Sequence, residues 1–122
     1  KSKSEGILSR LGFRYISDID FSAGTEYEDP VFNGALFGFQ AQALGCDIKD
    51  LAFVDTESFG IESHSPQTYQ TIIDMLRERK PQGQRIPGDI GNFGYNQMYD
   101  LDGVKLLYTD HHGYETFTIC GQ

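Results

Sequence analysis

The sequence predicts one α+β domain over residues 1–122, built from an antiparallel or mixed sheet of about five strands and one main helix. Three observations predict this class: an amphipathic helix over 66–80, a short apolar run just before it, and three strand-like runs near the C-terminus. A chain of 122 residues buries one hydrophobic core but leaves little room for a second. We expect the helix to pack on one face of the sheet, because its apolar stripe needs a surface to cover.

The N-terminal part of the chain predicts short elements. Apolar residues at helical spacing before Gly12 indicate one or two helical turns within residues 1–12. From residue 13 onward apolar and polar side chains alternate, so we expect a strand at least over 13–16. Residues 22–29 then predict a loop and an acidic stretch, which Pro30 prevents from being a central strand.

Residues 30–44 fit two different structures. An Asp-Pro pair at the start and a glycine just after the end are typical of a helix, but Gly34 and Gly38 would each weaken that helix by about 1 kcal/mol. Alternatively, Asn33 and Gly34 form a two-residue hairpin turn before a strand over 35–43, in which alternate positions are apolar. The alternation favours the strand, which we therefore predict.

The apolar run over 51–54 predicts a strand that is buried on both faces, because it is short and an acidic residue follows it. The helix over 66–80 has a good N-cap in Ser65, and Pro66 suits the first helical position. Basic residues gather at its C-terminal end, where they favour the helix dipole. Its apolar stripe consists of Tyr69, Ile72, Ile73 and Leu76.

Residues 81–91 are rich in proline and glycine, and we predict a loop there. Three strand-like runs follow, over 93–99, 104–108 and 114–119. Each link between them has the pattern Asp-x-x-Gly, which predicts a type I turn with an aspartate cap at its first position. The two links are Asp100 to Gly103 and Asp110 to Gly113. The C-terminal third therefore predicts an antiparallel meander.

The two cysteines, Cys46 and Cys120, either pair with each other or stay free. Their spacing is not that of a metal site, and two thiols alone do not identify a compartment. The apolar runs are too short to cross a bilayer, and no apolar core of a secretory signal follows the first residues. We expect a cytoplasmic protein without membrane contact.

Charge is distributed unevenly along the chain. The net charge is −8, and residues 15–63 contain ten acidic residues against a single base, Lys49. Negative charge repels phosphate backbones, so we expect a basic protein partner and no direct binding of nucleic acid. Alternatively, the acidic residues only keep the protein soluble. The ten acids are Asp18, Asp20, Glu26, Glu28, Asp29, Asp47, Asp50, Asp55, Glu57 and Glu62.

Aromatic residues are frequent in the predicted meander. Phe93, Tyr95 and Tyr99 share one face of a strand by parity. If the helix covers that face they belong to the core, and if it covers the other face they form an exposed tyrosine surface suited to protein contacts. We include Tyr95 and Tyr99, together with the ten acids, among the predicted partner-binding residues.

Two short motifs indicate possible chemistry. The first is Asp110-His111-His112, in which imidazoles and a carboxylate are able to bind a metal or transfer protons. These letters resemble the signature of the Asp-His-His phosphoesterase family, which needs further aspartate motifs that this chain lacks. The parallel with the turn from Asp100 to Gly103 supplies a structural reason for the aspartate and the glycine, so we interpret the motif as a turn.

The second motif runs from Phe53 to Gly60 and contains Asp55 and Glu57 directly after the predicted strand. It resembles the first motif of DnaQ-type 3′–5′ exonucleases, in which an Asp-x-Glu at a strand end holds catalytic divalent metals. The resemblance implies that Asp55 and Glu57 are metal ligands. It covers eight residues, and no second or third motif of that family follows.

Two functional hypotheses follow from the sequence. The first is an acidic, non-enzymatic binding module, such as an inhibitor or immunity-type protein that masks a basic site on a toxin or nuclease. This hypothesis includes no catalytic residue, metal or cofactor. The second is a small metal-dependent hydrolase or nuclease that uses Asp55 and Glu57 with a histidine. We favour the first, because the acidic segment is much longer than either motif.

Overall fold

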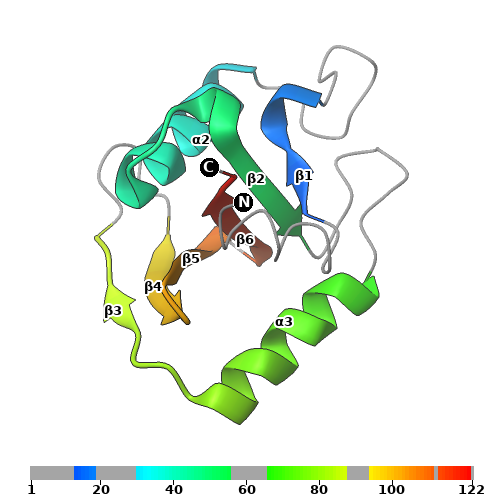
Figure 1. The fold of residues 1–122 in the computed structure, drawn as a ribbon. Helices are drawn as coiled ribbons and strands as arrows, with labels where there is room; N and C mark the ends of the chain where they lie inside the picture. The colour runs from blue at the N-terminus through cyan, green and yellow to red at the C-terminus, as the bar shows by residue number, and fades with distance from the viewer. Residues whose placement is uncertain (1–12, 19–29, 56–65, 88–93, 112, 122) are drawn as a thin grey trace.

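The structure, a computed structural model, describes residues 13–18, 30–55, 66–87, 94–111 and 113–121, and all structural statements refer to these. In them, six strands form one sheet between two α-helices (Figure 1). The strands are β1 (Arg14–Tyr15), β2 (Leu51–Asp55), β3 (Gln84–Arg85), β4 (Tyr95–Leu101), β5 (Val104–His111) and β6 (Tyr114–Cys120). The helices are α2 (Pro30–Leu44), α3 (Pro66–Arg79) and two short 3-10 helices, η1 (Ile16–Asp18) and η2 (Ile48–Asp50).

The sheet has the strand order β1-β2-β6-β5-β4-β3, and every neighbouring pair is antiparallel. β4, β5 and β6 are consecutive in the chain and in the sheet, which confirms the predicted α+β class and its C-terminal meander. β2 lies inside the sheet, and Leu51 to Val54 are at most 1% exposed, as predicted for an apolar strand covered on both faces. β1 is shorter than predicted, because the chain turns into η1 and buries Ile16 on the α2 side of the sheet.

Helix α3 confirms the predicted helix and covers one face of the sheet. Ile72 is 1% exposed, and its neighbours on the apolar stripe pack against the same core. The sheet contributes residues from five strands to this core, among them Tyr15, Val54, Tyr99, Leu106 and Phe117. The predicted N-cap, Ser65, and the helical turns predicted within 1–12 lie outside the described residues.

Helix α2 covers the opposite face of the sheet and corrects the predicted strand over 35–43. Leu36, Phe37 and Ala41 lie on one side of the helix and are at most 3% exposed. Burying side chains as large as Leu36 and Phe37 stabilises by about 1.5–3 kcal/mol each, which outweighs a penalty of about 1 kcal/mol for each internal glycine. The alternation of apolar residues over 35–43 was misleading, because it does not match burial. Phe39 and Ala43 are two of the alternating apolar residues and are only partly buried.

Helix α2 ends in a Schellman motif at Gly45. The N–H of Gly45 donates to the carbonyl oxygen of Gln42 at 3.1 Å, and the N–H of Cys46 donates to that of Ala41 at 3.0 Å. Gly45 has a φ of 84°, a backbone conformation that glycine adopts without steric cost. Gly45 therefore ends the helix, as the helical alternative for residues 30–44 predicts.

The links of the meander differ from the prediction in one detail. Both aspartate caps are present, because the N–H of Gly103 donates to Asp100 Oδ1 at 2.7 Å and that of Gly113 donates to Asp110 Oδ1 at 2.9 Å. However, Asp102 and Gly103 have φ values of 57° and 89° and form the two-residue connection of β4 and β5. Positive φ at both positions is typical of a type I′ turn, which matches strand twist better than type I.

The predicted loop over 81–91 contains a strand in its described part. β3 pairs with β4, with Gln84 opposite Met98 and Arg85 opposite Gln97. Residues 88–91 and Phe93 lie outside the described residues. No helix in the described part of the chain is long and apolar enough to span a membrane.

Candidate functional site

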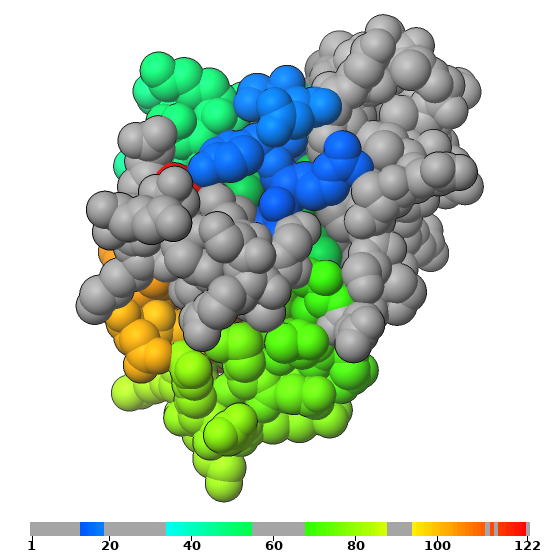
Figure 2. All heavy atoms as spheres, turned by 45° about the vertical axis from the view of Figure 1, so that its right-hand side comes forward, coloured from blue at the N-terminus to red at the C-terminus, as the bar shows by residue number. Residues whose placement is uncertain are grey.

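Three of the predicted partner-binding acids lie together at one end of the sheet. η1 and η2 contact each other, and the hydroxyl of Ser17 donates to the carbonyl oxygen of Lys49 at 3.5 Å. This contact brings Asp18 close to the segment from Asp47 to Asp50. We call η2 with the preceding Asp47, together with Asp18, the acidic turn; it contains three carboxylates and one lysine. Figure 2 shows, in blue, the exposed part of the segment 13–18, in which Phe13 and Ile16 are buried.

An apolar side chain lies within the acidic turn. Ile48 is 41% exposed, and in the described part of the chain only Tyr95 is another large hydrophobic residue that is exposed to this degree. Asp47 precedes Ile48 at the N-cap position of η2, but its side chain makes no capping hydrogen bond. The Asp47 carboxylate is therefore not used to cap the turn, and Ile48 exposes part of its side chain although Gly38 of α2 lies beside it. Sequence reasoning missed Ile48, whose signal is a single apolar residue between Asp47 and Lys49.

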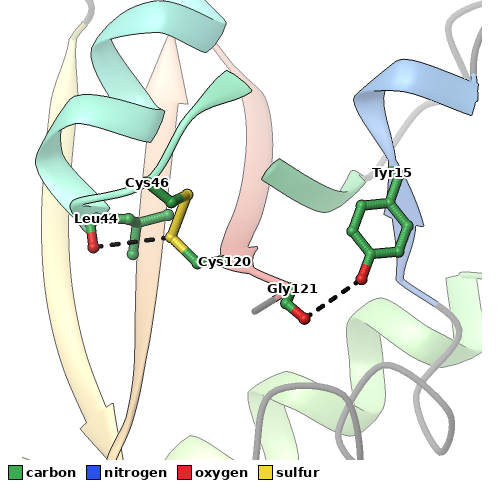
Figure 3. Close-up of a disulfide and its surroundings, with 5 residues drawn as sticks. All are labelled: Tyr15, Leu44, Cys46, Cys120 and Gly121. Atoms are coloured by element: carbon green, nitrogen blue, oxygen red, sulfur yellow. Dashed lines mark hydrogen bonds between the residues drawn. A yellow bond between two sulfur atoms is a disulfide. The ribbon is translucent and has the colours of Figure 1, made fainter. Parts of the chain in front are cut away.

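The acidic turn is attached to the sheet by a disulfide, which Figure 3 shows, and by a hydrogen bond from Gly121 to Asp50. A disulfide joins Cys46, just before the turn, to Cys120 at the end of β6, with 6.1 Å between the two Cα atoms. The N–H of Gly121 donates to the carbonyl oxygen of Asp50 at 2.8 Å, and the hydroxyl of Tyr15 donates to that of Gly121 at 3.4 Å. The turn is therefore held at both its ends.

The two predicted tyrosines lie elsewhere in the sheet. Tyr95 and Tyr99 belong to β4, which β6 and β5 separate from β2. Tyr95 is 46% exposed, and the guanidinium carbon of Arg85 lies 4.3 Å from its ring centroid. Tyr99 packs against the core beneath α3, and this burial raises its pKa. The structure therefore places Tyr95 on the surface and Tyr99 at the core, and neither lies beside the acidic turn.

A second cluster of polar side chains, which we did not predict from the sequence, lies near the start of α3. Glu115 Oε2 accepts hydrogen bonds from the hydroxyls of Tyr69, at 2.8 Å, and Tyr108, at 2.5 Å. Burial and then the contact with Glu115 raise the pKa of both tyrosines well above its ordinary value. Asp110 is the cross-strand neighbour of Glu115. A signal in the sequence is the tyrosine on the helix stripe, where a fully apolar residue is usual.

The residues of the two catalytic motifs are only partly described. Asp55, the last residue of β2, pairs with Thr116 of β6, and His111, the last residue of β5, pairs with Tyr114 of β6. Both therefore lie at the same end of the sheet, with β6 between their strands. In the described residues no group of three His, Cys, Asp or Glu side chains is arranged to hold a metal ion.

The acidic segment does not form one surface in the described part of the chain. Asp55 lies at the opposite end of β2 from Asp50, with the whole strand between them. Asp18 and Asp47 are exposed, and Asp50 is partly buried. The other six predicted acids lie outside the described residues: Asp20, Glu26, Glu28, Asp29, Glu57 and Glu62.

A small cavity beneath α3 is lined entirely by apolar side chains. Its volume is about 10 Å³, which is enough for about one water molecule. A site of this size and polarity does not accommodate an organic ligand. The lining residues include Phe13, Ile72, Met75 and Leu106.

The described residues thus offer a cross-linked acidic segment with an exposed apolar residue and, at the other end of the sheet, a partly buried cluster of two tyrosines and a carboxylate. Comparisons of the chain with protein-family models, with curated proteins and with solved structures found no match.

Proposed function

We propose that the chain is a non-enzymatic protein-binding module whose acidic turn binds a basic surface of a partner protein, as an inhibitor does. The observation that carries this proposal is Ile48, which is 41% exposed within a group of carboxylates on a turn cross-linked by the Cys46–Cys120 disulfide. An apolar anchor with a charged rim is the usual arrangement of a protein-binding site. The anchor supplies affinity and the carboxylates supply specificity.

The attachment of the turn supports the same proposal. A loop that is already fixed in its bound conformation loses little conformational entropy when it binds. The carboxylate of Asp47 makes no capping hydrogen bond in the turn, so its charge is available for a partner. Opposite charges also accelerate encounter, and this effect weakens as salt is added. A basic nuclease or toxin active site is the partner that suits an immunity-type inhibitor of this kind.

The disulfide bears on the compartment in which the protein works. Disulfides persist in oxidising compartments and are rare in the cytosol. Because Cys46 and Cys120 are bonded, we propose that the chain functions in an oxidising environment, as an alternative to the cytoplasmic location that the sequence led us to expect.

A binding experiment with matched variants tests the proposal. The chain is immobilised, exposed at low salt to extract from the source cell, and eluted with salt for identification by mass spectrometry. We expect a basic protein to be retained by the native chain and lost with the double variant Asp47→Asn, Ile48→Ser. The control variant, Asp74→Asn, removes one negative charge at an exposed position away from the turn.

Two results would contradict the proposal. One is equal retention of the basic protein by the turn variant, and the other is the absence of any basic protein that depends on the native turn. Circular dichroism of both variants establishes that neither result comes from unfolding.

The alternative is a small metal-dependent hydrolase or nuclease that uses Asp55, Glu57 and a histidine. The register that places Asp55 and His111 at the same end of the sheet favours it. A nuclease screen with Mg²⁺ and Mn²⁺ tests it, because a metal-dependent activity of this site must be lost with Asp55→Asn and be unaffected by Ile48→Ser.

A further inference from the structure

Four polar side chains are completely buried between α2 and the sheet. Gln40 comes from α2, Asn96 from β4, Thr109 from β5 and Thr116 from β6, and each is at most 1% exposed. The three strand residues are direct cross-strand neighbours, because Asn96 pairs with Thr109 and Thr109 pairs with Thr116. They form a polar row across the centre of the sheet, and Gln40 covers it.

Hydrogen bonds link all four side chains. Gln40 Nε2 donates to Thr109 Oγ1 at 3.2 Å and to Thr116 Oγ1 at 3.1 Å. The hydroxyl of Thr109 in turn donates to Asn96 Oδ1 at 2.8 Å. Both amide groups therefore contact the same threonine, which places them side by side beneath the helix.

One atom of each amide has no partner in this network. Gln40 Oε1, an acceptor, and Asn96 Nδ2, a donor, are buried and make no hydrogen bond within the described structure. Rotating either amide by 180° exchanges its oxygen and nitrogen but still leaves one of its atoms without a partner. Buried polar groups in native proteins are nearly always hydrogen-bonded, to the protein or to ordered water.

We propose that this polar site binds ordered water, which donates a hydrogen bond to Gln40 Oε1 and accepts one from Asn96 Nδ2. Water satisfies both atoms because a single molecule donates and accepts. The four side chains carry no formal charge, so the site does not favour an ion. Buried waters of this kind typically make about three hydrogen bonds to polar groups that lack other partners. The water and the two amides together would fix the position of α2 over the meander.

Nuclear magnetic resonance of the whole chain tests this proposal directly. A water molecule that stays bound for longer than about a nanosecond gives cross-relaxation of opposite sign to that of surface water. We expect such signals between water and the side-chain amide protons of both Gln40 and Asn96. Gln70 is the matched control, because its amide lies on the exposed side of α3 and donates to Asp74 Oδ1 at 2.9 Å.

A variant shows whether the two amides share the water. Gln40→Met keeps the length of the side chain and removes its amide, so we expect the water signal at Asn96 to be lost while the other resonances of α2 and β4 remain. Absence of long-lived water at either amide of the native chain would overturn the proposal. Persistence of the signal at Asn96 in Gln40→Met would overturn the shared site. Should this variant not fold, the native signals alone decide the result.

Discussion

The hydroxyl oxygen of Tyr15 lies where a side chain on residue 121 would have to be: a Cβ atom added to Gly121 would lie 2.1 Å from it. Two further ring atoms of Tyr15 would be within 2.5 Å. Gly121 is therefore a site of close approach between the first strand and the end of the last one. The same glycine holds Asp50 through its N–H, so this contact links the N-terminal strand, the C-terminus and the acidic turn.

We predict that Gly121→Ala destabilises the protein by about 1–3 kcal/mol, because the added methyl group must displace a ring that packs against the core. Urea unfolding followed by circular dichroism measures the change. The double variant Gly121→Ala, Tyr15→Ser removes the obstructing ring and should show a much smaller additional cost for the glycine change than the single variant does. An equal cost in both backgrounds would contradict the steric explanation.

Gly34→Ala is predicted to have the opposite effect. Gly34 lies within α2, is exposed, and has open space around the position of a Cβ atom. Alanine there restricts the unfolded chain without strain and should stabilise by about 0.4–1 kcal/mol. The hairpin that the alternation favoured would need positive φ at this position, so alanine would then destabilise. The sign of the change in urea midpoint therefore distinguishes the helix from the hairpin.

The segment around Gly34 also shows where prediction from the sequence reaches its limit. The helix over 66–80 and the meander were predictable because each has one periodicity that matches its burial pattern. α2 has apolar residues all along its length, so both periodicities fit it, and only the sheet it packs on decides between them. The two internal glycines counted against the helix in the prediction. In the structure both lie within α2, where Gly34 is exposed and Gly38 lies against Ile48.

The candidate site was predictable from the sequence only in part. Charge along the chain indicated acidic residues, and Asp18, Asp47 and Asp50 do lie together. Neighbours far apart in sequence were not predictable, because they depend on the register of the sheet. The contact of Asp50 with Gly121 and the pairing of Cys46 with Cys120 are of this kind. The exposed Ile48 became a candidate only when its burial was known.

Stability is predicted to fall at alkaline pH through Tyr69 and Tyr108. Both have a pKa raised above the ordinary value by burial and by Glu115, so the folded protein holds their protons more tightly than the unfolded chain does. The unfolded tyrosines lose their protons above a pH of about 10, which favours unfolding from there upward. Below this pH the contribution of the two tyrosines is fully present and constant.

Urea unfolding at pH 8, 9.5 and 10.5 measures this dependence. The variant Tyr69→Phe removes one of the two groups and should lose stability less steeply between pH 9.5 and 10.5. Absorbance of tyrosinate gives an independent measurement, since Tyr69 and Tyr108 should ionise only when the protein unfolds. Tyr95→Phe serves as the control, because Tyr95 is exposed. Ionisation of Tyr69 and Tyr108 in the folded protein would contradict the prediction.

Reduction of the Cys46–Cys120 disulfide is predicted to weaken both stability and partner binding, to different extents. The bond closes a long loop, with a sequence separation of 74, and its loss should cost about 2–5 kcal/mol in the free energy of unfolding. The double variant Cys46→Ser, Cys120→Ser measures this cost without a reductant present.

The same variant tests the effect of the disulfide on binding if it remains folded. The acidic turn then has one attachment to the end of β6 left, the hydrogen bond from the N–H of Gly121 to the carbonyl oxygen of Asp50. Binding of the basic partner should then weaken because the turn must be ordered on association. Gly34→Ala in the same background restores part of the stability without touching the turn, so binding that recovers with it would show that the disulfide acts only through stability.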